Sequence, residues 1–439
     1  MNEIKVIKFG GSSLADAEHF LQVKRIIESD PARAYVVPSA PGRRFSGDDK
    51  VTDLLYSCYD AARTGGDVDA VFDRVKARYT DIIAGLGLDL DLSAEFAQIK
   101  GAITHHAGRD YAASRGEYLN GVILAKLIGF DFIDAAFVIG FEENGTFDSE
   151  GTNAVLAELL KKHTRAVIPG FYGSMPNGTI KTFSRGGSDI TGAIVARAVN
   201  ASLYENFTDV SGIMMADPRI VANPRRIDVI TYAELREMSY MGAEVFHEDA
   251  VFPVRSAGIP INIKNTNAPD DPGTMIVPSS DRYEDTVITG IAGRRGFSII
   301  NIDKDMMNAE VGFGRRVLEV IEREGLCFEH LPSGIDTMSV VVSTAEIAPV
   351  RDEVIAGIRA AVKPDHISCE DGIALLAVVG RGMVKAKGTS ARVFMALAKS
   401  NVNVRIIDQG SSELNIVIGV DDADFDAALK AIYEEFAKR

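Results

Sequence analysis

Residues 8–13 read Lys-Phe-Gly-Gly-Ser-Ser, and this segment is the most informative one in the chain. It follows the apolar run 4–7 and precedes a helical spacing of apolar residues from Leu14 to Ile27, which predicts a strand, a glycine turn and a helix. Glycines let a backbone approach a bulky anion, and the N–H groups that begin a helix favour negative charge. With Lys8 beside them, these residues predict a phosphate-binding turn that follows neither the Walker A nor the GxGxxG pattern. A strand that ends in two glycines is also a common plain turn, so this interpretation needs support from the rest of the chain.

The composition disfavours several classes of protein. The chain has 439 residues, 46% of them hydrophobic, which suits two or three domains with a large core. A formal net charge of −15 disfavours binding to nucleic acid or to an anionic membrane, although small anions respond to local charge. Cys58, Cys327 and Cys369 are far apart, which argues against a disulfide framework or a zinc site. No apolar run approaches the ~20 residues of a membrane span, and the start lacks a signal-peptide core, so we expect a soluble cytoplasmic protein.

Apolar segments typical of strands alternate with amphipathic helical segments up to residue 265. This alternation predicts a mainly parallel sheet covered by helices on both faces, with ligand sites at the carboxyl ends of its strands. Residues 265–285 are rich in turn formers. We therefore expect a first domain over residues 1–268, a linker over 269–285 and a second region over 286–439.

An internal repeat lies in the second region, at an offset of 76 residues. The segment 312–321 aligns with 388–397, and Val340–Val342 aligns with Ile416–Ile418 without a gap. Each copy is predicted to be a helix, a strand, a turn and a strand. A unit this short leaves one sheet face uncovered, so two copies packed together are expected.

Polar clusters accompany the glycine turn at expected strand ends and helix starts. They are Ser39-Ala40 with Thr52-Asp53, Ser114-Arg115-Gly116-Glu117 (expected to open a helix), Pro169–Gly173 with Ser184–Asp189, and Phe207–Gly212 with Ala216–Arg219. Together they are more specific than any one of them.

These clusters resemble the motifs of aspartate kinases, which belong to the amino acid kinase family. The motifs KFGGS, SxGE, RGGSD, FTDV and ADPR appear here in order, and the repeat resembles a pair of ACT domains, the ligand-binding modules that carry feedback control in these enzymes. The resemblance covers essentially the whole chain. It implies an α/β amino acid kinase fold with a mainly parallel central sheet, followed by two ACT-like βαββαβ domains at about 298–365 and 366–439, with 286–297 as a candidate completing segment of the second. The chain ends after the second copy, so no fused homoserine dehydrogenase is expected.

The resemblance implies transfer of the γ-phosphoryl group of ATP to the β-carboxylate of L-aspartate. The product would be 4-phospho-L-aspartate, the first step toward lysine, threonine and methionine. That carboxylate has a pKa of about 4 and is already anionic at neutral pH, so catalysis rests on alignment and on charge stabilisation. Lys8 and Asp189 would be catalytic, and Mg²⁺ would accompany ATP without an evident protein ligand. The expected ATP contacts are Lys8, Gly10, Gly11, Ser12, Thr208, Asp209, Met214 and Arg219.

The substrate aspartate carries one ammonium and two carboxylates, so its pocket needs an anion and a cation. The family implies Glu117 for the ammonium and Arg185, a two-pronged donor, for a carboxylate. Alternatively, Ser188 or Asp189 merely caps the helix that follows. The expected substrate contacts are Ser39, Thr52, Glu117, Arg185, Gly186, Gly187 and Ser188.

The sequence departs from the family pattern at three places near the expected nucleotide. Met214 replaces a usual tyrosine, and Glu244 replaces a usual lysine. A charged, glycine-containing insertion occupies residues 42–50. Lys264 is a candidate substitute for the missing lysine, and a strand residue with a solvated tip is the alternative.

The repeat implies feedback control by an amino acid bound between ACT domains of two subunits. Lysine is the first hypothesis and threonine the second; the alternative is that the repeat serves only homodimer formation. The expected effector contacts are Met307, Gly312, Phe313 and Glu329.

Two further functions remain open from the sequence. One is a kinase for acetylglutamate, glutamate or a nucleoside monophosphate, against which Glu117 and Arg185 argue. The other is a sensor whose kinase half has decayed, against which the intact Lys8 and Arg185 argue.

Overall fold

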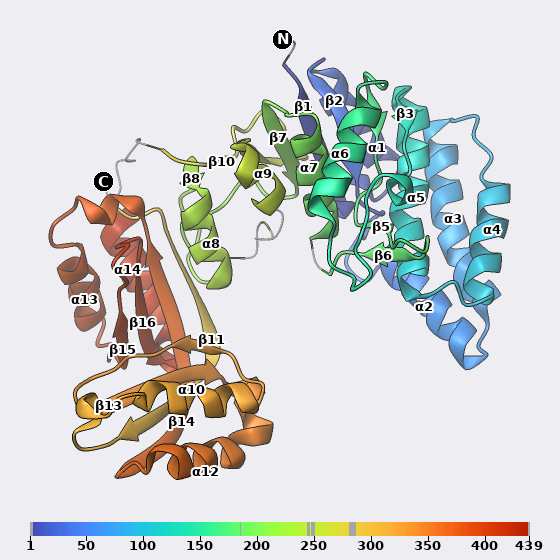
Figure 1. Cartoon of the computed structure of the whole chain (residues 1–439). Coiled ribbons are helices and arrows are strands. Elements are labelled where there is room, and N and C mark those ends of the chain that lie inside the picture. The colour runs from blue at the N-terminus through green and yellow to red at the C-terminus, as the bar shows by residue number, and fades with distance from the viewer. Residues whose placement is uncertain (1–2, 185, 244–245, 247–250, 281–286, 438–439) are drawn as a thin grey trace. The chain divides into compact units, whose positions relative to one another are not determined.

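The computed structural model describes residues 3–184, 186–243, 246, 251–280 and 287–437. The chain divides into two compact units (Figure 1). The first unit comprises Met1–Ile213, Asp228–Tyr232 and Val245–Ser280, and the second comprises Met214–Ile227, Ala233–Glu244 and Asp281–Arg439.

An eight-stranded sheet forms the centre of the first unit, in the order β3-β4-β2-β1-β7-β9-β10-β8. Neighbouring strands run parallel except β9 with β10, which confirms the predicted mainly parallel sheet. The strands are β1 Lys5–Phe9, β2 Arg33–Pro38, β3 Asp131–Phe132, β4 Ala166–Val167, β7 Leu203–Thr208, β8 Val229–Thr231, β9 Ile261–Asn265 and β10 Thr274–Val277.

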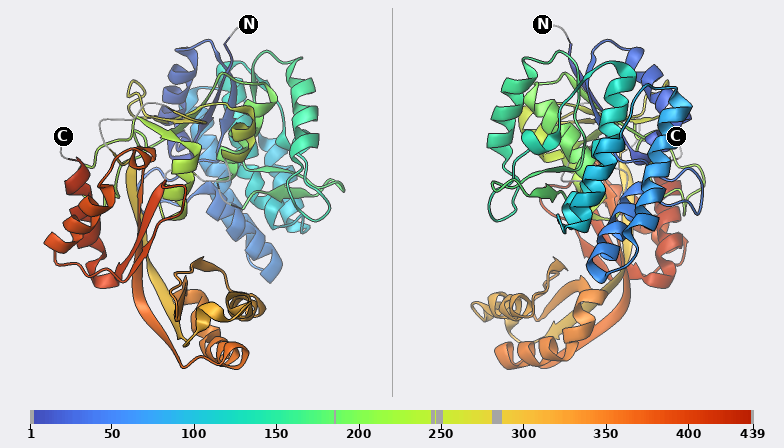
Figure 2. Two further views of the ribbon diagram at one scale, coloured as in Figure 1. Left: turned by 60° about the vertical axis from the view of Figure 1, so that its left-hand side comes forward. Right: turned by 90° about the vertical axis from the view of Figure 1, so that its right-hand side faces the viewer.

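Helices cover both faces of this sheet. The group α1 to α5 packs together on one face, and α7, flanked by α6 and α9, packs on β1, β2 and β7 (Figure 2). Their bounds are α1 Ala17–Glu28, α2 Val51–Thr64, α3 Val68–Leu86, α4 Ser93–Thr104, α5 Arg109–Ile128, α6 Ser149–Leu160, α7 Gly187–Ala198 and α9 Val251–Ala257. Helix α8, Tyr232–Tyr240, belongs to the second unit except for its first residue.

Side-chain alternation along β1 determines to which face of the sheet Lys8 points. Ile7 and Phe9 lie in the core that α1 to α5 share, and both side chains are fully buried. Successive side chains of a strand point to opposite faces. Lys8 therefore faces the side of the sheet that α7 covers.

Four short strands were not expected from the sequence. They are β5 Tyr172–Ser174 and β6 Ile180–Thr182, which form a separate hairpin, together with β8 and β10. Strands of three or four residues are too short for an alternating pattern to stand out. Strand β10 lies in the segment 269–285, which we expected to be a linker. The apolar residues 275–277 interrupt the turn formers there.

The second unit is built on a six-stranded antiparallel sheet in the order β12-β13-β11-β14-β16-β15. Strands β11 and β14 have 14 residues each and pair with one another along their length. The bounds are β11 Gly290–Asp303, β12 Phe328–His330, β13 Thr337–Ser343, β14 His366–Val379, β15 Ile406–Asp408 and β16 Asn415–Asp421.

The helices of this unit confirm the internal repeat. Helix α10 packs with α12 in the first copy, and α13 packs with α14 in the second (Figure 2). In each copy a helix is followed by two antiparallel strands, as the alignment predicted. The bounds are α10 Phe313–Arg323, α12 Arg351–Val362, α13 Thr389–Lys399 and α14 Phe425–Ala437.

No helix within the described part of the chain combines the length and apolar character needed to cross a membrane.

Candidate active site

Lys8 lies at the carboxyl end of β1 and is the central cation of the site. Its side chain is 9% exposed, and its Nζ lies 2.6 Å from Oδ1 of Asp189 on the first turn of α7. The structure thus brings together the two residues that the sequence predicted to be catalytic.

Asp189 is held by two residues that sequence reasoning missed. Asn206 donates its amide Nδ2–H to Asp189 Oδ1 at 2.7 Å, and the hydroxyl of Tyr204 donates to the backbone carbonyl of Asp189 at 3.0 Å. Both belong to β7, which pairs with β1, and Lys8 is the register partner of Asn206. Their spacing of two along a strand is the signal that places them on one face.

Asp189 does not cap its own helix. The residue before α7 is Gly186, in the left-handed conformation with φ 59°, and no side chain of the described part of the chain makes a capping hydrogen bond there. The alternative in which Asp189 serves only as a cap is therefore wrong. Ser188 is buried, and it does not cap the helix either.

The glycine turn differs from the expected geometry. Gly11–Leu14 forms a short 3-10 helix, η1, and α1 begins only at Ala17, where Asp16 accepts a hydrogen bond from the N–H of His19. The helix predicted from Leu14 is therefore wrong at its start, because the Asp16 cap begins a separate helix. The backbone N–H groups available to a phosphate at this turn therefore belong to η1 and not to the first turn of α1.

The predicted phosphate contacts at this turn are not equivalent. The N–H of Gly10 donates to the carbonyl of Phe207 at 3.0 Å, so it is engaged within the sheet. Ser13 exchanges a hydrogen bond of 2.6 Å with Thr266. Gly11 and the exposed Ser12 open η1, where the first N–H groups have no partner in the preceding turn.

Gly11 also has to be glycine for packing reasons. A Cβ on Gly11 would lie 2.8 Å from the carbonyl oxygen of Ala40, which follows β2. The neighbouring Ser39 donates its N–H to the carbonyl of Phe9 at 3.0 Å. The ends of β1 and β2 thus bring Ser39 beside the turn, and Thr52 lies on the first turn of α2, half-buried.

Glu117 is a buried carboxyl group with one oxygen unsatisfied. Its side chain lies on α5, the residue is 5% exposed, and its Oε2 has no hydrogen-bond partner among the residues that the structure describes. Burial raises the pKa of Glu117 to about 8, although a backbone hydrogen bond from Ala40 opposes the shift. A cationic ligand would satisfy this group. The expectation that residues 114–117 open a helix is wrong, because α5 begins at Arg109, after Gly108 with φ 101°.

The loop before α7 packs closely against the segment that follows β4. A Cβ on Gly170 would lie 2.5 Å from Ser188 Oγ, and a Cβ on Gly187 would lie 2.5 Å from the ring of Phe171. These glycines hold the loop close to the helix start that carries Gly186, Gly187 and Ser188. Arg185, the predicted carboxylate ligand, lies outside the described residues.

Thr208 is the last residue of β7, the strand adjacent to β1, and Asp209 follows it. The hydroxyl of Thr208 donates to Asp209 Oδ1 at 3.2 Å. On the next strand, β9, the half-buried Lys264 holds its Nζ 5.9 Å from the ring centroid of Phe207. This contact argues against a fully solvated tip for Lys264.

Met214 and Arg219 belong to the second unit. Arg219 is exposed and forms an ion pair with Asp217, with Nη2 2.7 Å from Oδ2. The Asp217 side chain also accepts the backbone N–H of Arg219 at 2.8 Å, the geometry of an Asx turn. Glu244 lies outside the described residues.

The predicted effector residues occupy two environments in the second unit. Met307 and Phe313 are part of the buried core of the first repeat, and Gly312 precedes α10 with φ 78°. Glu329 on β12 instead accepts a hydrogen bond of 2.5 Å from the Tyr240 hydroxyl. Among the residues that the structure describes, no three His, Cys, Asp or Glu side chains gather as metal ligands would.

Comparisons with known proteins match the whole chain. A model of the amino acid kinase family matches residues 3–265, and a model of an ACT domain matches residues 376–436. Aspartokinase 3 of Bacillus subtilis is 39% identical over 449 residues, which cover 99% of this chain and 98% of that protein. A bifunctional aspartokinase/homoserine dehydrogenase of Haemophilus influenzae is 30% identical over 98% of this chain and 56% of its own length.

Solved structures agree with these matches. The crystal structure of Clostridium acetobutylicum aspartate kinase has a TM-score of 0.90 and 50% sequence identity, and the match covers 100% of both chains. Aspartokinase III of E. coli, in complex with aspartate and ADP, has a TM-score of 0.78 at 24% identity, over 99% of this chain and 100% of that one, which shows a shared fold.

Proposed function

The chain belongs to the amino acid kinase family as an aspartate kinase with C-terminal ACT domains, and we propose that its phosphoryl transfer takes place around Lys8. The reaction moves the γ-phosphoryl group of ATP to the β-carboxylate of L-aspartate. The observation that carries the location is the ion pair between the buried Lys8 and the partly buried Asp189, beside a glycine turn at the carboxyl end of β1.

Lys8 is the group that stabilises the transferring phosphoryl. Negative charge spreads over the phosphoryl oxygens in the transition state, and a buried ammonium stabilises it better than a solvated one does. The aspartate carboxylate is ionised at neutral pH and needs no general base. Asp189 contacts Lys8 and Asn206, so we assign it the role of a positioning residue that orients the Lys8 ammonium.

The glycine turn and the end of β7 would hold the nucleotide. Gly11 and Ser12 offer N–H and hydroxyl donors, whereas Gly10 contributes close approach without a Cβ. Thr208, Asp209, Met214 and Arg219 remain proposed nucleotide contacts, with Lys264 as the candidate substitute for the family lysine. Mg²⁺ supplies charge neutralisation when it is bound to the phosphates of ATP, and we assign it no protein ligand.

The amino acid substrate would bind near Glu117. A buried carboxyl group with an unsatisfied oxygen suits the α-ammonium of aspartate. Arg185 is the proposed ligand of a carboxylate, and the remaining proposed contacts are Ser39, Thr52, Gly186, Gly187 and Ser188. Acetylated substrates and nucleotides lack the free ammonium that Glu117 would bind.

We further propose that residues 1–268 are the catalytic domain and 286–439 the regulatory one. Lysine or threonine would bind the first ACT repeat near Met307, Gly312, Phe313 and Glu329, and the repeats would form the homodimer. The structure of E. coli aspartokinase III in complex with lysine and aspartate supports lysine as the first candidate to test. The enzyme is proposed to act in the cytoplasm, at the start of lysine, threonine and methionine synthesis.

A single assay tests the proposed reaction. The purified chain is given MgATP with aspartate, glutamate or acetylglutamate in turn, and hydroxylamine traps any acyl phosphate. Trapped product is expected with aspartate alone. Product with either other substrate, or none with aspartate, would contradict the proposal.

A further inference from the structure

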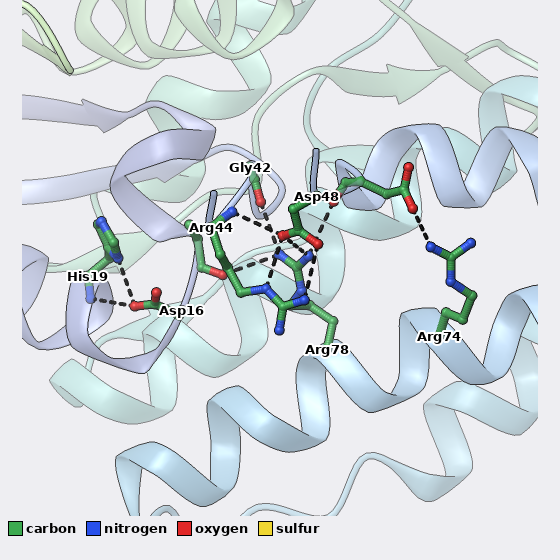
Figure 3. Close-up of polar contacts among 9 residues, drawn as sticks. Asp16, His19, Gly42, Arg44, Asp48, Arg74 and Arg78 are labelled. Carbon is green, nitrogen blue, oxygen red and sulfur yellow. Dashed lines mark hydrogen bonds and ion pairs between the residues drawn. The ribbon is translucent and has the colours of Figure 1, made fainter. Parts of the chain in front are cut away.

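The insertion 42–50 is fixed to the body of the first unit by an ion-pair network in which Arg78 is buried and Arg44 is exposed. Arg44 donates to Asp48 through its backbone N–H and Nε, both at 3.0 Å, and through Nη2 at 3.1 Å. Figure 3 shows that Arg78, from α3, also reaches Asp48. Hydrogen bonding to Arg44 and the charge of Arg78 hold the pKa of Asp48 well below its ordinary value, so Asp48 is ionised at neutral pH.

Arg78 connects the insertion to the glycine turn. Its side chain is 4% exposed, and Nη2 donates to Asp48 Oδ2 at 2.5 Å and to the carbonyl of Asp49 at 3.2 Å. Nη1 donates to the carbonyl of Gly42 at 3.0 Å and to that of Ala15 at 3.4 Å. Ala15 directly follows η1. One guanidinium therefore ties together both ends of the insertion and the end of the turn.

The peptide of Gly42 is in direct contact with the turn. Its N–H donates to the carbonyl of Gly11 at 2.8 Å. A Cβ on Gly42 would lie 2.7 Å from the carbonyl carbon of Gly11 and 2.8 Å from the backbone nitrogen of Ser12. Two backbones cross here with no side chain between them, so a shift of Gly42 moves the donors of the turn directly.

We propose that Arg78 and Asp48 are positioning residues for phosphoryl transfer, which hold the Gly42 peptide against the turn and so fix the direction of the Gly11 and Ser12 donors. This role rests on the proposed function of the turn. We call this connection from Arg78 and Asp48 through Gly42 to the turn the latch. All four acceptors of Arg78 lie in the insertion or beside the turn, as the latch requires. Among the described residues, Arg74, one turn earlier on α3, contacts Asp49 and donates to neither Gly42 nor Ala15.

The test compares Arg78→Ala, Arg78→Lys and Asp48→Asn with the matched control Arg74→Ala. The readouts are kcat, KM for MgATP, KM for aspartate and the thermal unfolding midpoint. Misplaced catalytic donors lower kcat/KM. We therefore expect kcat/KM for MgATP to fall roughly tenfold or more in Arg78→Ala, with a smaller change in KM for aspartate. Arg78→Lys should recover little, because lysine lacks the fork that reaches several acceptors. Added guanidinium ion should restore part of the lost kcat in Arg78→Ala, and Arg74→Ala should match the wild type.

Two results would overturn the latch. One is that Arg78→Ala and Arg74→Ala show the same kinetics while Arg78→Ala alone unfolds earlier, which makes Arg78 a structural brace. The other is equal loss for MgATP and aspartate without rescue by guanidinium. If Arg78→Ala does not fold, Asp48→Asn, which keeps the shape of the side chain, decides by the same criteria. A wild-type chain that does not phosphorylate aspartate would refute the proposed function separately, and binding of a non-hydrolysable ATP analogue would then be the readout for the latch.

Discussion

Lys8 Nζ lies 2.6 Å from Oδ1 of Asp189, so the carboxyl end of the central strand and the first turn of α7 meet at one ion pair. The same carboxylate oxygen accepts a hydrogen bond from Asn206 at 2.7 Å. Lys8 is therefore held in one orientation before any phosphate arrives, and little rearrangement is required at the moment of reaction.

Removal of the Lys8 ammonium should abolish most turnover without unfolding the protein. For Lys8→Ala we expect kcat to fall roughly 10²–10³-fold, the usual loss when a preorganised transition-state donor is removed. The matched control is Lys5→Ala on the same strand, where Lys5 pairs with Asp30 at 2.9 Å. Steady-state kinetics and circular dichroism of both variants provide the measurement; near-normal turnover in Lys8→Ala would refute the assigned role.

Neutralising Asp189 should misdirect Lys8 without removing it. Asp189→Asn is expected to lower kcat roughly tenfold to a hundredfold, because the ammonium loses its anionic anchor but stays in the site. Asn206→Ala should have a smaller effect in the same direction, since it removes only the support of Asp189. Equal activity of wild type and Asp189→Asn, measured at saturating MgATP and aspartate, would exclude a positioning role.

Binding of aspartate should release a proton near neutral pH. The pKa of Glu117 is raised to about 8 by burial, so Glu117 is mostly protonated at pH 7 in the free enzyme. An ammonium ligand favours the ionised carboxylate, and this lowers the pKa and expels the proton. Calorimetric titration of aspartate in buffers of different ionisation enthalpy measures this release. It should disappear in Glu117→Gln and fade above pH 8, and a binding enthalpy independent of buffer in the wild type would contradict it.

Breaking the buried Arg33–Glu205 ion pair should greatly lower the free energy of unfolding. Arg33 Nε lies 2.7 Å from Glu205 Oε2 and Nη2 lies 2.9 Å from Oε1, and Glu205 is 3% exposed. Breaking a buried pair leaves an uncompensated charge, so Glu205→Gln should cost about 3–5 kcal/mol of unfolding free energy. The control is Lys161→Gln, which breaks an exposed pair with Glu158. Denaturant titrations that show the same midpoint for both variants would contradict this reading.

Feedback control should be visible as inhibition by an amino acid. An effector shifts activity only if it binds one state better than another, so saturating lysine or threonine should lower turnover if the first repeat is the regulatory site. The effect of each compound is measured alone and in combination, in wild type and in Glu329→Gln. Unchanged activity under all these conditions would leave the repeats with a role in assembly only.

The architecture was largely predictable from the sequence because its signals are long-range and regular. Strand and helix periodicity identified β1, β2 and β7, and the repeat register identified the second unit. The pairing of Lys8 with Asp189 was not predictable, since it depends on which face of the sheet α7 covers.

The role of Arg78 was invisible for a different reason. A charged residue within an amphipathic helical pattern is ordinarily solvated. Arg78 is buried where it contacts the insertion, and no local pattern in the sequence encodes that contact.

Strands β11 and β14 each continue through both ACT-type repeats: residues 297–303 of β11 pair with β13, and residues 373–379 of β14 pair with β16. The two copies therefore share the long strands of one sheet and are not independent domains. Deleting one copy would remove part of the sheet of the remaining copy and expose an unpaired strand edge, which is prone to aggregation. A fusion of this proposed regulatory region to another enzyme would therefore have to contain both repeats as one unit.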